Sequence, residues 1–378
     1  MDYDLNDEQV MLRDSARKFL SKECDGMFVR KMIQDEKGYT EDFWKKIVEL
    51  GWTGLLIPEQ YGGFELSFLD LTVLLYEMGY CCLPGPYFST AVLGTLTLLE
   101  SGSDLQKKAV LPDVASGERL LTMAWIEAGG GYSAEGISLK AEEASDGYVL
   151  SGTKIFVPDA HVAHTILCVA RTGDDGFDKA QGVSLFVIDA KSPGIRIEPM
   201  DTFTGQKLCE VAFEKVKVPA ENMIGVLHQG WPALERLLLK VAVAKCAEMS
   251  GGAARVLEVV VEYAKQREQF GQPIGSFQAI QHHCANMLTE ADASRLMTYQ
   301  AAWRISEGLS HEREASMCKA WVSDSYRRLM MLGHQVMGGT GFMEEHDIHL
   351  FYNRAKAAEV AFGDGEFHRE KVAAAMGM

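Results

Sequence analysis

Residues 267–271, Arg-Glu-Gln-Phe-Gly, could bind a phosphate group at the end of a long helical pattern. The guanidinium of Arg267 carries a planar fork of N–H donors that fits two phosphate oxygens at once. A basic residue near a helix C-terminus also interacts favourably with the helix dipole when no ligand is present. Taken alone, the segment favours this second interpretation, because most arginines lie at the solvated surface.

A second possible anion site is the run His334-Gln335-Val336-Met337-Gly338-Gly339-Thr340-Gly341. Paired glycines let a backbone approach a ligand closely, and their N–H groups can face an anion. A helix C-cap followed by a tight turn would need only one glycine. The additional glycines therefore favour a binding role.

A third segment, Glu359 to Arg369, contains carboxylates, a histidine and glycines, which suit acid–base catalysis. Asp364 could equally cap a helix that starts after Gly365, because an aspartate oxygen accepts hydrogen bonds from the first turn of a helix. The residues themselves leave both roles open.

Two further segments lie in the middle of the chain. Residues 125–133, Trp-Ile-Glu-Ala-Gly-Gly-Gly-Tyr-Ser, form a glycine-rich loop after a predicted strand, and such a loop alone is weak evidence for a ligand. In residues 153–161, Phe156 leaves a strand just before a turn, and packing in the core is the default explanation for such an aromatic residue.

Three zones of different periodicity must position these segments. Residues 1 to about 120 show helical patterns: Asn6 can cap a first helix, a second around 43–50 is stopped by Gly51, and a third covers about 66–78. From about 121 to 225 the period is two. Short strands are predicted there at 147–150, 165–170, 183–188 and 210–213, with turns at 146–147, 151–152, 175–176 and 193–194.

Helical patterns return at Gly230 and are long. Apolar residues repeat at three, four and seven positions up to Gly271, and further helices are predicted at about 276–307, 312–337 and 347–362. The order is helices, then strands, then helices, without βαβ alternation. A Rossmann nucleotide site is therefore disfavoured.

The composition excludes some classes of partner. The 378 residues are 47% hydrophobic and 24% charged, which favours two or three packed domains. A formal net charge of −16 argues against nucleic acid and against an anionic membrane surface, although a local basic pocket could still bind a phosphate-bearing substrate. The sequence shows neither a signal peptide nor a membrane span, so we expect a cytoplasmic protein. Its eight cysteines lack metal-site spacing, so we expect reduced thiols and no metal site.

Taken in order, these segments resemble the acyl-CoA dehydrogenase family over essentially the whole chain. A glycine-rich loop opens a β domain, Arg267-x-x-Phe270-Gly271 ends the first helix of a helical domain, and Gln335-x-x-Gly338-Gly339-x-Gly341 precedes a C-terminal carboxylate motif. The resemblance implies an α+β multidomain fold. Its domains would be an N-terminal helical domain at 1–120, a central β-barrel or sandwich domain at 121–228 and a C-terminal four-helix bundle at 229–378.

The resemblance also implies an FAD-dependent oxidoreductase that acts on an acyl-CoA substrate and passes electrons to an electron-transfer flavoprotein or a similar acceptor. In this family a carboxylate removes the α-proton of the thioester while a hydride leaves the β-carbon for the flavin. The thioester carbonyl must be polarised, because its α-proton is otherwise too weakly acidic for a carboxylate base. Family proteins are usually tetramers, so a homotetramer or a heterotetramer with a paralogous subunit is expected.

The same resemblance assigns site residues. Arg267, Gln269, Phe270, Gln335, Gly338 and Gly339 would meet the adenosine-diphosphate half of FAD, the last three from a neighbouring subunit. Phe156 and Ile126 would lie at the flavin ring, and Asp364 and Glu366 would also contact the cofactor. Tyr132 and Ser133, on the loop that begins at Glu127, would lie beside the thioester. Tyr87 and Thr90, after Pro86, would reach the acyl tail.

Several positions depart from the family pattern. The glutamate base falls on Phe362, and the alternative base position that some relatives use falls on Val241; neither side chain can accept a proton. Ala242 stands where many relatives carry an arginine for CoA. Ile126 and Pro158 stand where flavin-contacting hydroxyls are usual, and each lost hydrogen bond should cost roughly 1 kcal/mol.

These departures suggest three interpretations. The chain could be the subunit of a mixed tetramer that lacks the base and lends cross-subunit FAD contacts, either with a part in catalysis or as a purely structural subunit. Another acid could be the base, with Asp364, Asp159 and Glu248 as the candidates. The protein could also catalyse a different elimination or cleavage of an acyl-CoA. Lys245, on the same apolar stripe as Val241, is read as snorkelling rather than catalytic. The acyl group is left open.

Overall fold

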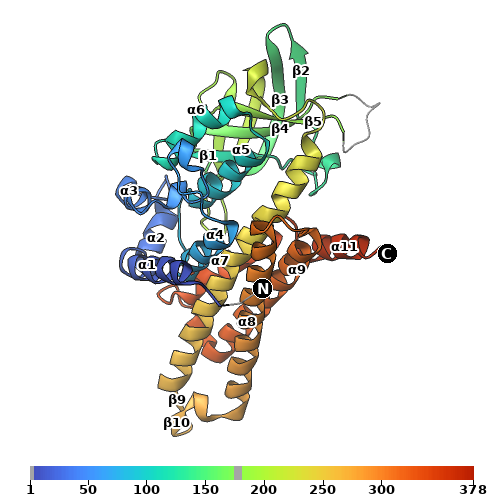
Figure 1. The fold of residues 1–378 in the computed structure, drawn as a ribbon. Helices are drawn as coiled ribbons and strands as arrows, with labels where there is room; N and C mark the ends of the chain where they lie inside the picture. Colours follow the sequence, from blue (N-terminus) through green and yellow to red (C-terminus); the bar gives the residue numbers. More distant parts are fainter. Residues whose placement is uncertain (1–3, 174–180) are drawn as a thin grey trace. The chain divides into compact units, whose positions relative to one another are not determined.

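The computed structural model describes residues 4–173 and 181–378, so the turn predicted at 175–176 lies outside the described residues. The chain divides into two compact units (Figure 1). The first, the helical unit, comprises Met1–Arg30, Ser67–Leu83 and Leu239–Met378. The second, the β unit, comprises Lys31–Leu66 and Pro84–Leu238. Each unit contains residues from more than one of the three sequence zones.

The N-terminal helices of the helical unit begin at side-chain caps. In α1 (Asp7–Glu23) the side chain of Asn6 accepts a hydrogen bond from the backbone N–H of Gln9 at 2.8 Å, which confirms the predicted cap. Asn6 and Gln9 form a capping box, in which each side chain accepts from the other residue's N–H, and Ser67 and Asp70 form one at the start of α4 (Phe68–Tyr80). These caps satisfy N–H groups that have no partner within the helix.

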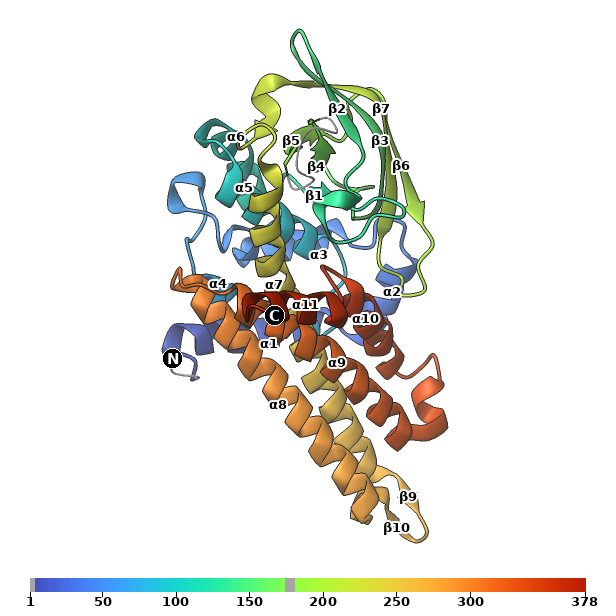
Figure 2. The same cartoon turned by 90° about the vertical axis from the view of Figure 1, so that its right-hand side faces the viewer.

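The C-terminal part of the helical unit consists of long helices. They are α7 (Gly230–Gln266), α8 (Gln278–Ser306) and α9 (Glu312–Met337), as the apolar periodicity predicted; α7 also contributes its first residues to the β unit. Helices α8 and α9 lie side by side, and α10 (Ile348–Val360) and α11 (Gly365–Ala375) pack against α9 (Figure 2).

An eight-stranded sheet forms the centre of the β unit. Its order is β6-β7-β3-β2-β4-β5-β8, and β1 pairs in parallel with β4. The four predicted strands all lie within it. The strands are β1 (Leu121–Ala124), β2 (Lys140–Ala144), β3 (Gly147–Pro158), β4 (Thr165–Arg171), β5 (Val183–Asp189), β6 (Ile195–Met200), β7 (Leu208–Pro219) and β8 (Met223–Ile224).

The register between β3 and β7 shifts twice, and the second shift lies between Lys154 and Val157. Such an irregularity bends a strand and re-aims its side chains. Here Phe156 takes a left-handed backbone conformation, with φ +54°. The bulge therefore determines the direction of the aromatic side chain that the sequence analysis selected.

Helices complete the β unit. They are α2 (Gly26–Gln34), which also contributes to the helical unit, α3 (Glu41–Glu49), α5 (Thr95–Ser101) and α6 (Asp104–Ala115). Gly51, with φ +76°, follows α3 and confirms the predicted stop. Residues Phe88–Gly94 form a π-helix, a rare conformation that occurs often at functional sites.

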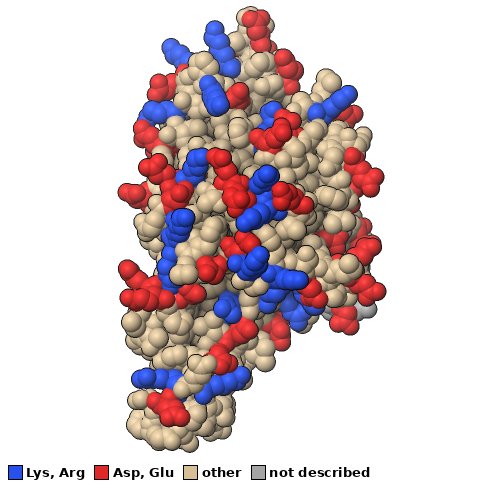
Figure 3. Space-filling view, turned by 90° about the vertical axis from the view of Figure 1, so that its left-hand side faces the viewer, with Lys and Arg blue, Asp and Glu red and all other residues tan. Residues whose placement is uncertain are grey.

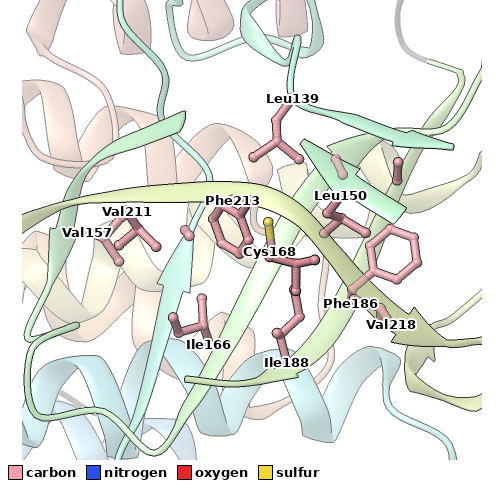
Figure 4. Close-up of a cluster of buried hydrophobic side chains, with 14 of the residues drawn as sticks. Leu139, Leu150, Val157, Ile166, Cys168, Phe186, Ile188, Val211, Phe213 and Val218 are labelled. Atoms are coloured by element: carbon pink, nitrogen blue, oxygen red, sulfur yellow. The ribbon is translucent and has the colours of Figure 1, made fainter. Parts of the chain in front are cut away.

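The core of the β unit is a cluster of buried apolar side chains from the strands (Figure 4). Phe186, Phe213 and Ile166 are among its fully buried members. Burying one such side chain stabilises the fold by about 1.5–3 kcal/mol relative to exposing it. Cys168 lies in the same cluster, and all eight cysteines of the chain are free thiols.

The charged residues of the surface are mixed in sign on the face drawn in Figure 3, where Lys and Arg side chains are interspersed with Asp and Glu. Among the described residues, none of the helices combines the length and apolar character that crossing a membrane requires. The same residues include no group of three His, Cys, Asp or Glu side chains that could hold a metal ion.

Candidate functional site

A short hairpin follows α7 and carries the first predicted phosphate-binding segment. Its strands are β9 (Glu268–Gln269) and β10 (Gln272–Pro273), and the backbone N–H of Ile274 donates to the carbonyl of Arg267 at 2.8 Å. Phe270 is 93% exposed and contacts Phe277 edge to face, with ring centroids 6.1 Å apart. Within the described residues Arg267 forms no ion pair. The hairpin thus presents an exposed guanidinium and an exposed aromatic ring.

The second glycine-rich segment is a turn at the end of α9. Gly338 has φ +57°, which favours glycine, and its N–H donates to the carbonyl of His334. A Cβ atom added at Gly338 or Gly339 would meet no atom within 4 Å, so both backbones face open space. Residues Gly338–Phe342 then form a 3₁₀ turn, η7. The structure therefore combines the cap and the accessible backbone that the sequence left as alternatives.

A side-chain hydrogen bond brings these two segments together. The hydroxyl groups of Tyr263 and Thr340 are 3.3 Å apart. Tyr263 lies one helical turn before Arg267, and Thr340 directly follows Gly339. Gln335 is exposed on the last turn of α9. The six residues predicted to meet the adenosine-diphosphate half of FAD are thus gathered at one end of the helical unit.

A fully buried lysine holds the turn between α10 and α11. Lys319 is 0% exposed, and its Nζ donates to the carbonyl oxygens of Ala358, Glu359 and Gly363 at 2.9–3.0 Å and to the hydroxyl of Ser323 at 2.9 Å. Burial lowers the pKa of Lys319 to about 8. This ammonium therefore compensates carbonyl groups that have no partner at the C-terminus of α10.

His368 holds the same turn from the other side. Its Nε2 lies 3.0 Å from the carbonyl oxygen of Phe362, and burial lowers the pKa of the imidazole to about 4. Asp364 caps α11 by accepting from the N–H of Phe367 at 2.9 Å, so the structure shows the capping role that the sequence left open. Glu366 is exposed in the first turn of α11. Contact of Asp364 or Glu366 with FAD stays a prediction.

The two positions that the resemblance assigns to the base carry no acid. Val241 is 0% exposed in the interior of α7, as is Ala242 beside it. Phe362 is half-buried in the turn, with φ +61°. The chain thus offers apolar side chains at both positions and at the neighbouring CoA position.

The alternative acids are all engaged elsewhere. Besides Asp364, which caps α11, Glu248 pairs with Lys245. Asp159 accepts a hydrogen bond from the hydroxyl of Ser89 at 2.6 Å. Lys245 is largely buried and ion-paired, so it does more than extend its ammonium to solvent.

In the β unit, the carboxylate of Glu127 at the start of the glycine-rich loop binds the residues at its end. Its carboxylate lies 2.6 Å from Nζ of Lys154, which is 0% exposed, and it accepts from the N–H groups of Ser138 and Leu139 at 3.0 Å. Burial alone would raise the pKa of Glu127, but Lys154 and the hydrogen bonds outweigh burial and lower the pKa. The hydrogen bonds from the N–H groups of Ser138 and Leu139 to Glu127 thus close the loop, and the ion pair with Lys154 holds the Glu127 carboxylate in place.

The loop carries Tyr132 and Ser133, the residues predicted to lie beside the thioester. The ring of Tyr132 lies 6.3 Å from that of Trp125, and Ser133 is exposed. These observations place both residues on an accessible loop, while substrate contact stays a prediction.

Ile126 and Phe156, both predicted at the flavin ring, are neighbours in the structure. The N–H of Ile155 donates to the carbonyl of Ile126 at 2.9 Å, which joins the two segments. Phe156 is 48% exposed, so the default explanation of core packing is wrong for this residue. The bulge in β3 turns the ring out of the core.

The residues predicted at the acyl tail are buried and already hydrogen-bonded. The hydroxyl of Tyr87 donates to the carbonyl of Trp52 at 3.0 Å. The hydroxyl of Thr90, in the π-helix, donates to the carbonyl of Leu121 at 3.3 Å and accepts from its N–H at 3.1 Å. A contact with substrate would therefore use their apolar atoms, and it stays a prediction.

Two buried lysines were not predicted from the sequence. Lys154 lies in the strand before the selected Phe156, and Lys319 lies on the inward face of α9 beside Cys318 and Val322. A lysine at a position that periodicity assigns to the core was the available signal, since lysine is almost never buried without partners.

Comparison with known proteins gives matches over nearly the whole chain. The family models described as acyl-CoA dehydrogenase N-terminal, middle and C-terminal domains match residues 6–118, 122–216 and 228–377. The probable acyl-CoA dehydrogenase YngJ of Bacillus subtilis is 32% identical over 378 residues, which are 99% of each chain.

Solved structures agree with these matches. Butyryl-CoA dehydrogenase from Megasphaera elsdenii superimposes with a TM-score of 0.93 at 27% identity, covering 100% of both chains. The FAD complex of PigA superimposes with a TM-score of 0.92 at 26% identity, covering 100% of this chain and 99% of that one.

Proposed function

Because the chain belongs to the acyl-CoA dehydrogenase family, we propose that it takes part in α,β-desaturation of an acyl-CoA thioester as the subunit of a mixed tetramer that lacks the base. The family consists of FAD-dependent acyl-CoA oxidoreductases, and FAD is the cofactor.

The observation that carries the proposal is the absence of an acid at either base position. Removing the α-proton of a thioester requires a positioned base. Phe362 and Val241 have no titratable atom, and Val241 is sealed in the interior of α7. Asp364, Glu248 and Asp159 are each committed to another partner. We infer that a group outside this chain removes the proton.

The residues present fit one half of FAD better than the other. At the hairpin and the glycine turn, the guanidinium of Arg267 can neutralise a pyrophosphate, the open backbones of Gly338 and Gly339 can donate to it, and Phe270 offers a ring for adenine. At the other half, Ile126 and Pro158 have no hydroxyl to donate. The resemblance placed only the glycine turn on a neighbouring subunit; because one chain carries both segments side by side, we infer that it lends Arg267 and the glycine turn together across a subunit interface.

When bound, FAD accepts the hydride that leaves the β-carbon of the thioester. The contribution of this chain is then binding and orientation. Arg267 and the glycine turn hold negative charge, Glu127 and Lys154 keep the glycine-rich loop closed, and Lys319 keeps the α10–α11 turn in place. None of these groups takes the α-proton.

Several finer features belong to the same proposal. We propose three domains, at 1–120, 121–228 and 229–378, and the matched ranges of the family models support this division. An electron-transfer flavoprotein or a similar acceptor would reoxidise the flavin. The free thiols support a reducing compartment such as the cytoplasm.

Flavin content tests the lending role. The chain would be purified alone and after co-expression with a family member that keeps the glutamate. We expect little flavin absorbance in the chain alone and stoichiometric flavin in the co-purified assembly. An Arg267→Gln variant should assemble but lose flavin, and Lys265→Gln, at an exposed position two residues away, is the matched control. A chain that is fully flavinated alone would overturn the proposal.

A further inference from the structure

His334 is held between two aromatic rings at the end of α9. Its imidazole stacks on Phe342, with ring centroids 4.8 Å apart and an interplanar angle of 26°, and meets Tyr352 edge to face at 5.3 Å. Within the described part of the chain, its buried Nδ1 has no hydrogen-bond partner. Ring packing, rather than hydrogen bonding through Nδ1, therefore fixes this side chain.

The glycine turn closes directly over this ring. A Cβ atom built at Gly341, which is buried, would lie 2.9 Å from Nδ1 of His334, closer than real Cβ contacts come. Phe342, the stacking partner, is the last residue of η7. The imidazole thus contacts the turn through both Gly341 and Phe342.

Few side chains restrain the rest of the turn. Gly338 and Gly339 carry no side chains and face open space, and the hydroxyl of Thr340 lies 3.3 Å from that of Tyr263 while its carbonyl accepts the N–H of Met343 at 3.3 Å. Glycine loses more conformational freedom on ordering than any other residue. A turn with two exposed glycines therefore binds a ligand well only if neighbouring groups order it beforehand.

The charge state of His334 suits this environment. Burial lowers its pKa, and His349 on α10 lowers it further. A neutral imidazole packs between aromatic rings without the cost of burying a charge.

We propose that His334 is a positioning residue that orders the Gly338–Phe342 turn, and that it thereby presents the backbone of Gly338 and Gly339 to the adenosine-diphosphate half of FAD. The FAD part rests on the proposed function, whereas ordering of the turn does not. His334 contacts no predicted ligand atom and acts only through Gly341 and Phe342.

Two substitutions approach the contact from opposite sides. His334→Ala removes the ring, and Gly341→Ala pushes a methyl group against it. Each should loosen the turn and weaken FAD binding by roughly tenfold, the size expected when aromatic contacts that order a binding segment are lost. In the double variant the methyl group has room, so Gly341→Ala should add little to His334→Ala. His334→Phe keeps a flat ring at this position and should bind FAD as the wild type does.

Hydrogen exchange of the turn and FAD titration are measured on the full chain and on its co-expressed assembly. His282→Ala, at an exposed position on α8, is the control. We expect faster exchange at 338–343 and weaker FAD binding in both single variants, with melting temperatures near that of the wild type. Unchanged hydrogen exchange in His334→Ala would overturn the proposal. So would a double variant in which the losses of FAD affinity from the two single substitutions add.

The two readouts separate this proposal from the proposed function. Faster exchange with unchanged FAD affinity would overturn the link between the turn and the cofactor. If the wild type bound no FAD in either form, the proposed function would fail and the FAD part of this proposal with it. Exchange in the FAD-free chain would then still decide whether His334 orders the turn.

Discussion

Replacing His368 with glutamine should make the stability of the helical unit less sensitive to acid. His368 is 1% exposed, and its Nε2 contacts the carbonyl of Phe362 in the α10–α11 turn. Burial lowers the pKa of this imidazole from 6.5 to about 4. The folded chain therefore keeps His368 neutral at a pH where the unfolded chain protonates it.

The sign and size of the effect follow from this difference. Between pH 6.5 and about 4 the unfolded chain binds one more proton than the folded chain, so the free energy of unfolding falls as the pH falls through this window. At about 1.4 kcal/mol per pKa unit, the shift from 6.5 to about 4 corresponds to roughly 3 kcal/mol. Glutamine does not titrate, and its amide can still donate to Phe362.

The assay is urea denaturation followed by circular dichroism at a series of pH values, for the wild type and for His368→Gln. The wild type should lose roughly 3 kcal/mol more than the variant as the pH falls from 6.5 to 4. His311→Gln, in the loop before α9, is the control and should follow the wild type. Parallel curves for the wild type and His368→Gln would show that His368 does not cause this loss of stability.

Three further predictions concern the buried cations and the exposed arginine. Lys154→Met leaves the carboxylate of Glu127 buried without its partner and should lower the free energy of unfolding by about 3–5 kcal/mol. The double variant Glu127→Gln with Lys154→Met should lose clearly less, and equal losses would contradict the role of the ion pair. Lys319→Met removes the donor for three carbonyl groups, and each carbonyl left unpaired costs roughly 1–3 kcal/mol. Hydrogen exchange at 358–364 should therefore be faster than in the wild type, and equal protection would contradict this role of Lys319. Arg267→Gln should lower the flavin retained by the co-expressed assembly several-fold without changing its subunit ratio on gel filtration, and full retention would show that the hairpin does not hold the cofactor.

Caps, glycine stops and apolar periodicity predicted the helices well, because each depends on residues close together in the sequence. The side chain of Asn6 caps α1 within one turn, and Gly51 ends the region of α3 with a positive φ. The repeat of apolar residues predicted α7, α8 and α9 because each buries one continuous face. The gathering of Arg267 with the glycine turn followed only from the family resemblance, since the Tyr263–Thr340 contact spans 77 residues of sequence.

Other features depend on tertiary structure and could not be predicted from the sequence. Phe156 reads as a core residue in an alternating strand, but the bulge opposite β7 turns it outward. Asp364 suited both a cap and a site residue until the start of α11 was known. The partners of Lys319 lie some 40 residues away, on a turn whose position depends on packing against α9.

Acyl-CoA oxidation by the chain alone, with added FAD and an artificial electron acceptor, tests the central claim most directly. We expect no dye reduction above background with any acyl-CoA of a broad panel, because neither Phe362 nor Val241 can take the α-proton. Activity should appear once a family member that keeps the glutamate is present. Robust acyl-CoA-dependent dye reduction by the chain without any partner would contradict it.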